Sequence, residues 1–219
     1  MNVESFISNW LQKNGKSDLQ TMFKEQREKY PNNSILRRGF AIEQNIETDT
    51  ILFLGMNPSY KPGTDGGFYE EYGHWYFNRI KDVTNEVNKR MLTSFPFAHH
   101  DIFFVRDTSQ ARVLDMKAEM GDFFKTQMDI SKELIAASHP KLIVVVNAGA
   151  SKIFQNEMCV WRPSSPEQWN DELGVDYISV CEIRMPVLFT GMLSGQRALD
   201  DGSYYSLIWH ICHILKAIL

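Results

Sequence analysis

The feature of this sequence that most restricts its fold is residues 51–59, Ile-Leu-Phe-Leu-Gly-Met-Asn-Pro-Ser, where an apolar run enters a turn. Four consecutive apolar residues predict a strand that is buried on both faces, as in a parallel sheet. Gly55, Asn57 and Pro58 are turn-forming residues, so we expect the strand to end there. In open α/β sheets, ligands bind outside the carboxyl ends of the strands. The turn therefore puts the amide of Asn57 and the hydroxyl of Ser59 where a ligand is expected.

Further apolar segments alternate with helical patterns along the chain. Strands that alternate with helices are typical of βαβ units, which build a mainly parallel sheet with helices on both faces. We therefore expect an α/β fold, a three-layer αβα sandwich with a mainly parallel central sheet of four to five strands. The expected strands are residues 50–54, 102–105, 142–146, 177–181 and 186–190, and the expected helices are 3–13, 17–30, 75–92, 116–138, a short one from 150, and 203–218.

The N-terminal part of the chain reads as a pair of helices. Val3, Ile7 and Leu11 follow the spacing of one helical face, and Pro31 breaks a second helix that Asp18 caps. We expect residues 1–47 to form an N-terminal helical extension packed on the core, and residues 48–219 to form the α/β domain.

Composition limits the class of protein. A hydrophobic content of 43% and a charged content of 23% are typical of a globular chain. No apolar run approaches the roughly 20 residues that cross a bilayer, and no basic and apolar leader is visible at the N-terminus. We expect a cytoplasmic monomer with no membrane partner. The net charge of −4 argues against coating nucleic acid by bulk charge, but leaves a local basic patch from Arg37, Arg38, Arg79, Lys81, Lys89, Arg90 and Arg197 open.

Metal and cofactor sites have weak signals. The three cysteines, Cys159, Cys181 and Cys212, form no CxxC pair. The segment His99-His100-Asp101 has metal-binding residue types, but adjacent residues in an extended chain point to opposite faces, which makes joint ligation awkward. His210 and His213 have a helical spacing that suits a metal but no evident third ligand. The spacing of the glycines does not fit a dinucleotide-binding loop. We expect no metal and no cofactor.

Polar residues follow four of the expected strands. Asn57 and Ser59 follow the first, Thr108 and Ser109 the second, Asn147 the third, and a loop with Ser194 the last. If these strands are parallel, all four loops open on one edge of the sheet. Amides, hydroxyls and backbone N–H groups suit hydrogen bonding to a neutral polar ring and anchoring of phosphates.

Three segments carry a resemblance to a known family. Gly55-Met56-Asn57-Pro58-Ser59 resembles the first motif of the uracil-DNA glycosylase superfamily, and is closest to the mismatch-specific uracil/thymine branch, whose motif reads Gly-Ile/Met-Asn-Pro-Gly. Residues 192–197, Met-Leu-Ser-Gly-Gln-Arg, stand where that branch carries a Met-Pro-Ser loop with a nearby arginine. Residues 144–150 resemble the apolar strand and helix start between the two motifs. The sequence departs from the branch at Ser59 and Leu193, and lacks the histidine that other branches carry in the second motif.

The resemblance implies a hydrolase that cleaves the N-glycosidic bond of a deaminated or damaged base, with DNA as its partner. It implies catalytic roles for Asn57, which would orient a water, and for Ser194. It implies a base-binding set and a set that contacts phosphates. The first set is Gly55, Met56, Ser59, Tyr60, Phe68, Thr108, Ser109 and Asn147, and the second is Ser194, Gly195, Gln196 and Arg197.

Structural roles compete with these functional ones. Among the aromatic residues after the motif, Tyr60, Phe68, Tyr69 and Tyr72, some are expected to pack the loop rather than stack on a base. Asn147 suits the cap of a helix as well as a ligand contact. Asp65 and Asp107 are the nearby carboxylates that could deprotonate water. Two other hypotheses are a catalytically weak or inactive member of the fold that binds nucleic acid or a free base or nucleotide, and an unrelated α/β hydrolase or transferase.

Overall fold

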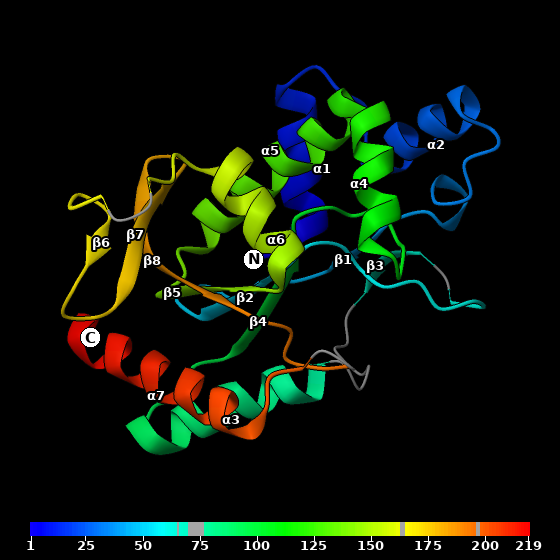
Figure 1. The fold of residues 1–219 in the computed structure, drawn as a ribbon. Helices are drawn as coiled ribbons and strands as arrows, with labels where there is room; N and C mark the ends of the chain where they lie inside the picture. Colours follow the sequence, from blue (N-terminus) through cyan, green and yellow to red (C-terminus); the bar gives the residue numbers. More distant parts are fainter. Residues whose placement is uncertain (65, 70–76, 163–164, 196–197) are drawn as a thin grey trace.

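The computed structural model describes residues 1–219 except 65, 70–76, 163–164 and 196–197 (Figure 1). Within the described residues, the central sheet has six strands in the order β4-β2-β5-β8-β7-β6. The first four of these are parallel to one another, and β7 and β6 extend the sheet as antiparallel strands. The strands are β2 (Ile51–Gly55), β4 (Phe97–Asp101), β5 (Leu142–Val146), β6 (Trp169–Asn170), β7 (Val175–Val180) and β8 (Ile183–Thr190).

Helices cover both faces of this sheet, as Figure 1 shows. The α/β class and the mainly parallel sheet are confirmed, but the sheet has six strands rather than four or five. None of the described helices is both long and apolar enough to cross a membrane. The helices are α1 (Val3–Lys13), α2 (Leu19–Lys29), α3 (Asn78–Met91), α4 (Gln110–Glu119), α5 (Gly121–Ser138), α6 (Ala148–Ile153) and α7 (Asp201–Ile218), with a 3-10 turn at Leu36–Arg38 and a π turn at Phe154–Met158.

Two apolar clusters show how the layers pack. On one face, Phe53 of β2 and Val144 of β5 pack with the buried side chains of α3 and α7. On the other face, Leu54 and Val145 of the same strands pack with α1, α5 and α6. Alternate residues of β2 and β5 therefore enter opposite clusters, which is why both strands are apolar at every position up to Gly55.

The second strand lies earlier in the chain than its apolar pattern predicts. The prediction of residues 102–105 is wrong, because β4 covers Phe97–Asp101 and pairs with β2 in register, with Asp101 opposite Gly55. Residues 102–105 form a buried extended segment beyond the strand, and Phe40 bridges to Val105. The apolar residues of this segment are thus buried without belonging to the sheet.

The N-terminal segment also contains a strand. Strand β1 (Ala41–Glu43) pairs in parallel with β3 (Gly67–Tyr69), and both lie outside the six-stranded sheet. The buried face of α1, formed by Val3, Ile7 and Leu11, joins the same apolar cluster as β2 and β5. The segment 1–47 is therefore packed into the core through α1 and through Phe40 and Ile42 next to and within β1.

A core substitution in α1 tests this packing. We expect Leu11→Ala to lower the free energy of unfolding by about 2–5 kcal/mol, because Leu11 is completely buried in the shared cluster. The neighbouring Gln12→Ala is exposed and should change it by less than about 0.5 kcal/mol. Urea unfolding followed by circular dichroism measures both. A separate early transition for Leu11→Ala, with the main transition unchanged, would show that residues 1–47 unfold independently.

Candidate functional site at the carboxyl edge of the sheet

The order of the parallel strands locates a candidate ligand site. The helix that follows β2 is α3, on one face, whereas the helix that follows β5 is α6, on the opposite face. Because β2 and β5 are neighbours, the sheet has its topological switch point between them. Ligands of open α/β sheets bind at such a point, outside the carboxyl ends of the strands. The loops after β2 and β5, which contain Asn57 and Asn147, lie at this position.

Hydrogen bonds fix the orientation of the Asn57 amide. Its Nδ2 donates to the backbone oxygen of Asp107 at 2.7 Å and to that of Pro58 at 3.1 Å. Since both partners are carbonyl oxygens, the nitrogen must face them, and Oδ1 faces away. Among the described residues, Oδ1 receives no hydrogen bond. Asn57 therefore ties the loop after β2 to the segment after β4 and leaves one acceptor for a ligand or a water.

Asp107 is a structural centre of this loop. Its Oδ2 accepts a hydrogen bond from Arg38 at 2.6 Å and lies 3.3 Å from Arg112, and its Oδ1 accepts from the backbone N–H of Ser109 at 2.7 Å. Its own backbone N–H donates to Pro58. Two guanidinium groups and a backbone donor occupy the carboxylate, so Asp107 is poorly placed to take a proton from water. The other carboxylate of this kind, Asp65, lies outside the described residues.

Tyr60 and Thr108 lie beside this centre. The guanidinium of Arg38 stacks over the ring of Tyr60 at 4.4 Å, and that of Arg106 lies 5.3 Å from the same ring. The hydroxyl of Thr108 donates to the backbone oxygen of Tyr60, and the hydroxyl of Ser109 caps α4. Tyr60, Thr108 and Ser109 thus hold the loop around Asp107 together.

Asn147 has a backbone conformation that is rare for a residue with a side chain. Its φ of 78° and ψ of 156° belong to a region that glycine almost alone adopts, at a cost of about 1–3 kcal/mol. Its Oδ1 accepts from the backbone N–H of Ala150, so the predicted cap of α6 is present. Among the described residues, its Nδ2 has no acceptor, although the residue is only 7% exposed. A strained residue at the switch point, whose amide donor has no acceptor among the described residues, indicates a functional position.

The loops after β2 and β5 touch through Gly149. A Cβ atom there would lie 2.9 Å from the sulfur of Met56 and 2.7 Å from Oε1 of Gln110, so only glycine fits without a shift. Met56 is itself almost completely buried. Gln110, the first residue of α4, was not predicted from the sequence, where it has no pattern of its own. Met56 therefore acts as a packing residue beneath the site.

The loop after β8 brings a third polar group to the edge. Ser194 is 7% exposed, and its hydroxyl has no hydrogen-bond partner among the described residues. Gly195 has a φ of 84°, and Met192 and Ala198 bridge across the loop. The strands that precede Asn57, Asn147 and Ser194 are consecutive in the sheet. The predicted residues Gln196 and Arg197 lie outside the described residues.

Two other predicted site residues lie differently. Phe68 in β3 makes an edge contact with Phe40 at 5.5 Å and packs on the cluster that contains α1 and α5. This contact corresponds to the packing role of Phe68 rather than to base stacking. Ser59 is exposed. Of the predicted aromatic residues, Tyr72 lies outside the described residues, and Tyr69 donates a hydrogen bond to Glu43.

The cluster around Glu43 was missed by the sequence analysis. Both oxygens of this buried carboxylate are occupied: Oε1 lies 2.8 Å from Nδ1 of His99, and Oε2 lies 3.2 Å from Nδ1 of His100. The ring of His99 contacts Phe77 on the α3 face, whereas His100 reaches Ser131 of α5 on the other face. Adjacent histidines can share one carboxylate because β4 is an edge strand and Glu43 lies beyond that edge. The sequence signal was His99-His100-Asp101, but nothing near it pointed to Glu43.

The cluster shifts the acid–base properties of its members. Burial opposes ionisation of Glu43, but the hydrogen bonds from His100 and His99 prevail and hold its pKa well below the usual range. Burial also opposes the charge on His99, yet the nearby carboxylates of Asp101 and Glu43 raise its pKa overall. Burial raises the pKa of Asp101 to about 6, although His99 acts in the opposite direction. The cluster therefore combines an ionised Glu43 with a histidine that is easily protonated.

Asp101 lies directly over Gly55, at the start of the family-like motif. A Cβ atom on Gly55 would be 2.1 Å from Oδ1 of Asp101, and 3.3 Å from Nε2 of His99. Asp101 is 8% exposed, and its nearest ionic partner is that nitrogen of His99 at 3.9 Å. Among the described residues, no donor lies within hydrogen-bonding distance of the Asp101 carboxylate. The absence of a side chain on Gly55 thus lets a buried carboxylate lean across β2.

Glu43, His99 and Asp101 are also of the right types to bind a metal, with ligand atoms within 4.8 Å of one another. However, Oε1 of Glu43 already accepts from Tyr69 and lies next to His99, and Oε2 lies next to His100. A metal on Glu43 would have to displace these contacts. The geometry of these residues therefore fits a hydrogen-bond network better than a metal centre.

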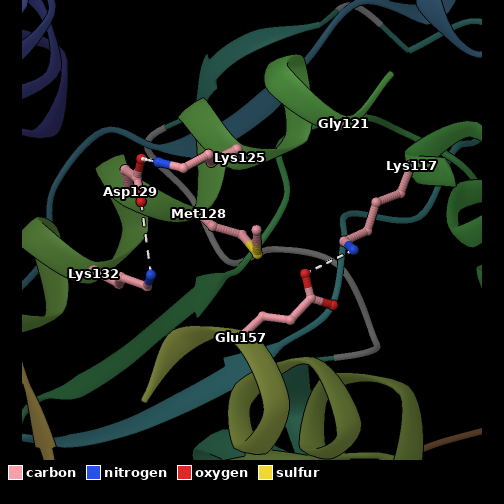
Figure 2. A pocket seen from close by; sticks show the side chains of 7 residues that line it. All are labelled: Lys117, Gly121, Lys125, Met128, Asp129, Lys132 and Glu157. Carbon is pink, nitrogen blue, oxygen red and sulfur yellow. Dashed lines mark hydrogen bonds and ion pairs between the residues drawn. The ribbon is translucent and has the colours of Figure 1, made fainter. Parts of the chain in front are cut away.

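Outside this edge, a hollow of about 360 Å³ lies between α4, α5 and the π turn (Figure 2). Its three lysines all lie next to one of its two carboxylates: Lys117 pairs with Glu157 at 2.7 Å, and Asp129 pairs with Lys125 at 2.7 Å and lies 3.7 Å from Lys132. Two arginines of the expected basic patch are also paired, Arg79 with Asp201 and Arg90 with Glu86. Neither region therefore rivals the carboxyl edge of the sheet as a candidate site.

Comparison with protein-family models and with curated proteins finds no match for this chain. The assignment of a function therefore depends on the residues and their positions. The carboxyl edge of the sheet provides four polar side chains that share one property, an atom without a partner among the described residues. These side chains are Asp101 at the end of β4, Asn57 after β2, Asn147 after β5 and Ser194 after β8.

Removing the charge of Glu43 tests the buried cluster. We expect Glu43→Gln to lower the free energy of unfolding at neutral pH by about 3–5 kcal/mol, because two buried histidines lose their shared carboxylate. In the parent protein, the lowered pKa means that the contribution of Glu43 is present above the ordinary pKa of 4.5 and is lost as the pH falls below it. Urea unfolding between pH 6 and pH 2 should show this acid loss, which begins near pH 4.5, and Glu43→Gln should lack it.

The control for this substitution is Glu28→Gln, which removes an exposed partner of Lys24. It should change the stability by less than about 1 kcal/mol at every pH. An equally small effect for Glu43→Gln would mean that the cluster does not stabilise the fold.

Proposed function

We propose that this chain is a uracil-DNA-glycosylase-like hydrolase that cleaves the N-glycosidic bond of a deaminated or damaged base in DNA. The observation that supports the proposal best is the set of four polar side chains at the carboxyl edge of the sheet. Each has an atom without a partner among the described residues, and three of them are at most 8% exposed. Buried polar groups are normally hydrogen-bonded, so the unpartnered hydroxyl of Ser194 and its neighbours at this edge are suited to a ligand.

Asn57 is the residue that holds the attacking water in this proposal. Its Nδ2 is bound to two backbone carbonyls, so its Oδ1 is the atom that can accept a hydrogen bond from water. An amide is too weak a base to take a proton in the ground state. Asn57 therefore contributes by orientation, which is worth a large factor when the water must approach one carbon of the sugar.

The reaction adds one water across the bond between sugar and base. The water oxygen forms a bond with C1′ of the sugar, and the bond from C1′ to the base nitrogen breaks with its electron pair on the base. One proton of the water ends on the departed base, and the hydroxyl stays on the sugar. The base must first leave the helix stack and enter the site, where its edge is held by hydrogen bonds.

The loop after β8 suits contact with the DNA backbone. Ser194 offers a buried hydroxyl, and the positive φ of Gly195 turns the backbone sharply at this point. Hydroxyls and backbone N–H groups are common donors to phosphate oxygens. In the proposal, this loop holds the phosphates next to the extruded nucleotide, and Gln196 and Arg197 remain predicted members of the same set.

The second candidate is a protein of this fold that binds nucleic acid or a free base without turnover. The departure from the family pattern at Leu193 favours it, because this side chain is buried in the cluster with α3 and α7. Binding without turnover would leave the role of the edge as a ligand site intact and remove only the catalytic part of the proposal.

An excision assay with a substitution at Asn57 separates the two candidates. The substrates are single- and double-stranded oligonucleotides that contain uracil, hypoxanthine, xanthine, an oxidised guanine or a mismatched base. We expect an abasic product with at least one of them, and we expect Asn57→Ala to lower the rate about a hundredfold with little change in binding. The rate comes from alkaline cleavage of the product, and the binding from fluorescence anisotropy.

Asn85→Ala, on the exposed side of α3, is the matched control and should keep the parent rate. Absence of product with every substrate, at high enzyme concentration and long times, would refute the hydrolase. Binding that is unaffected by Asn57→Ala in that case would support the second candidate.

A further inference from the structure

Asp101 has a property that the proposed function does not use. It is a buried carboxylate with no hydrogen-bond donor among the described residues, at the same edge as Asn57, Asn147 and Ser194. An ionised carboxylate has two oxygens and accepts hydrogen bonds only. Its ionic partner, Nε2 of His99, lies 3.9 Å from Oδ1, which is beyond hydrogen-bonding distance, so a group that donates to both oxygens would be favoured there.

The direction of the side chain places it in the candidate site. Asp101 is opposite Gly55 in the register of β4 and β2, and its Oδ1 lies where a Cβ on Gly55 would stand. The carboxylate therefore leans from the edge strand over β2, towards the switch point between β2 and β5. The backbone continues in parallel beyond it, because Phe103 donates to the oxygen of Met56 and Asp107 to that of Pro58. Asp101 thus lies one layer below the Asn57 turn.

The residues behind Asp101 hold it in this position. His99 lies two residues earlier on the same face of β4, with its Nε2 3.9 Å from Oδ1 of Asp101. Glu43 fixes the ring of His99 through its other nitrogen at 2.8 Å. A carboxylate that orients a histidine by one ring nitrogen leaves the other nitrogen directed at the next group, here Asp101. Glu43 and His99 act in this arrangement as positioning residues.

We propose that Asp101 determines the specificity of the site, by accepting two hydrogen bonds from a base that carries a ring N–H beside an exocyclic amino group. Guanine and its damaged derivatives have this edge, with N1–H and the 2-amino group side by side. Hypoxanthine has a C2–H in place of the amino group, and the ring N–H of uracil lies between two carbonyl oxygens, so each of these bases offers the carboxylate a single hydrogen bond. The inference rests on the proposed function and narrows its substrates to damaged bases that keep their amino group.

Guanine and hypoxanthine make a sharp test, because they differ only in the 2-amino group. The probes are single-stranded oligonucleotides of one sequence with one non-cleavable 2′-fluoro nucleotide that carries guanine, 8-oxoguanine, hypoxanthine or uracil. We expect the parent protein to bind the two guanine probes at least about tenfold more tightly than the other two, within the range that one bidentate contact to a base edge provides. Anisotropy measures binding without any need for turnover.

The isosteric Asp101→Asn should abolish this preference, because its amide has one acceptor and one donor and therefore matches the ring N–H beside a carbonyl that guanine, hypoxanthine and uracil share. Asp101→Ser should also abolish the preference. Asp115→Asn, on the exposed side of α4, is the control and should keep the parent preference. Thermal melting shows whether each variant is folded. Asparagine and serine remove the carboxylate in different ways, so one folded variant of the two is enough to test the inference.

The outcomes separate this inference from the proposed function. Loss of the guanine preference in Asp101→Asn without excision of any base would support the inference and refute the hydrolase. Excision with a preference for uracil or hypoxanthine, or a guanine preference that Asp101→Asn leaves unchanged, would refute the inference and keep the hydrolase. Failure of the parent protein to bind any of the four probes would refute the inference.

Discussion

The candidate site depends on the hydrogen bonds that His99 and His100 both make with the buried carboxylate of Glu43. A buried charge is tolerated only when hydrogen bonds and an opposite charge compensate for the loss of water. Glu43 obtains both from β4, and a third hydrogen bond from Tyr69 in β3. The carboxylate thereby joins three strands of which only β4 belongs to the central sheet. It fixes the edge strand, and with it the position of Asp101 over Gly55.

The order of the strands converts this edge into a site. Four parallel strands end at the same side, and the connections after β2 and β5 leave to opposite faces of the sheet. The strained backbone of Asn147 lies at this divergence, and the cap of α6 helps to offset its cost. The strained backbone of Asn147, its amide donor and the hydroxyl of Ser194, which have no partners among the described residues, do not improve the packing of the fold. Their presence together is more readily understood if a ligand completes the edge.

The sequence predicts β2 and β5 to within one residue, because parallel strands buried on both faces are apolar at every position. It fails at β4, whose histidines are buried by a carboxylate 56 residues away rather than by apolar neighbours. Because β4 begins five residues earlier than the expected strand, Asp101 stood before that strand and was not recognised as a strand-end residue. Asn57, Asn147 and Ser194 were found because each follows an apolar strand. Helices α4 and α5 were expected as one from residue 116, whereas Met120 lies between them with a non-helical backbone.

In the proposed hydrolase, the chemistry of the edge makes the identity of the base more important than the activation of water. Asp107 is held by Arg38 and Arg112, and the Asn57 amide is not a base, so the described groups around the turn offer weak help to the attacking water. The rate must then depend on the departing base. A carboxylate beside that base opposes the growth of negative charge on it, whereas donors on the base would relieve the opposition. A purine that leaves with a proton on its ring carries less negative charge and still offers donors to the carboxylate. A guanine-type edge at Asp101 is therefore favoured for catalysis as well as for recognition.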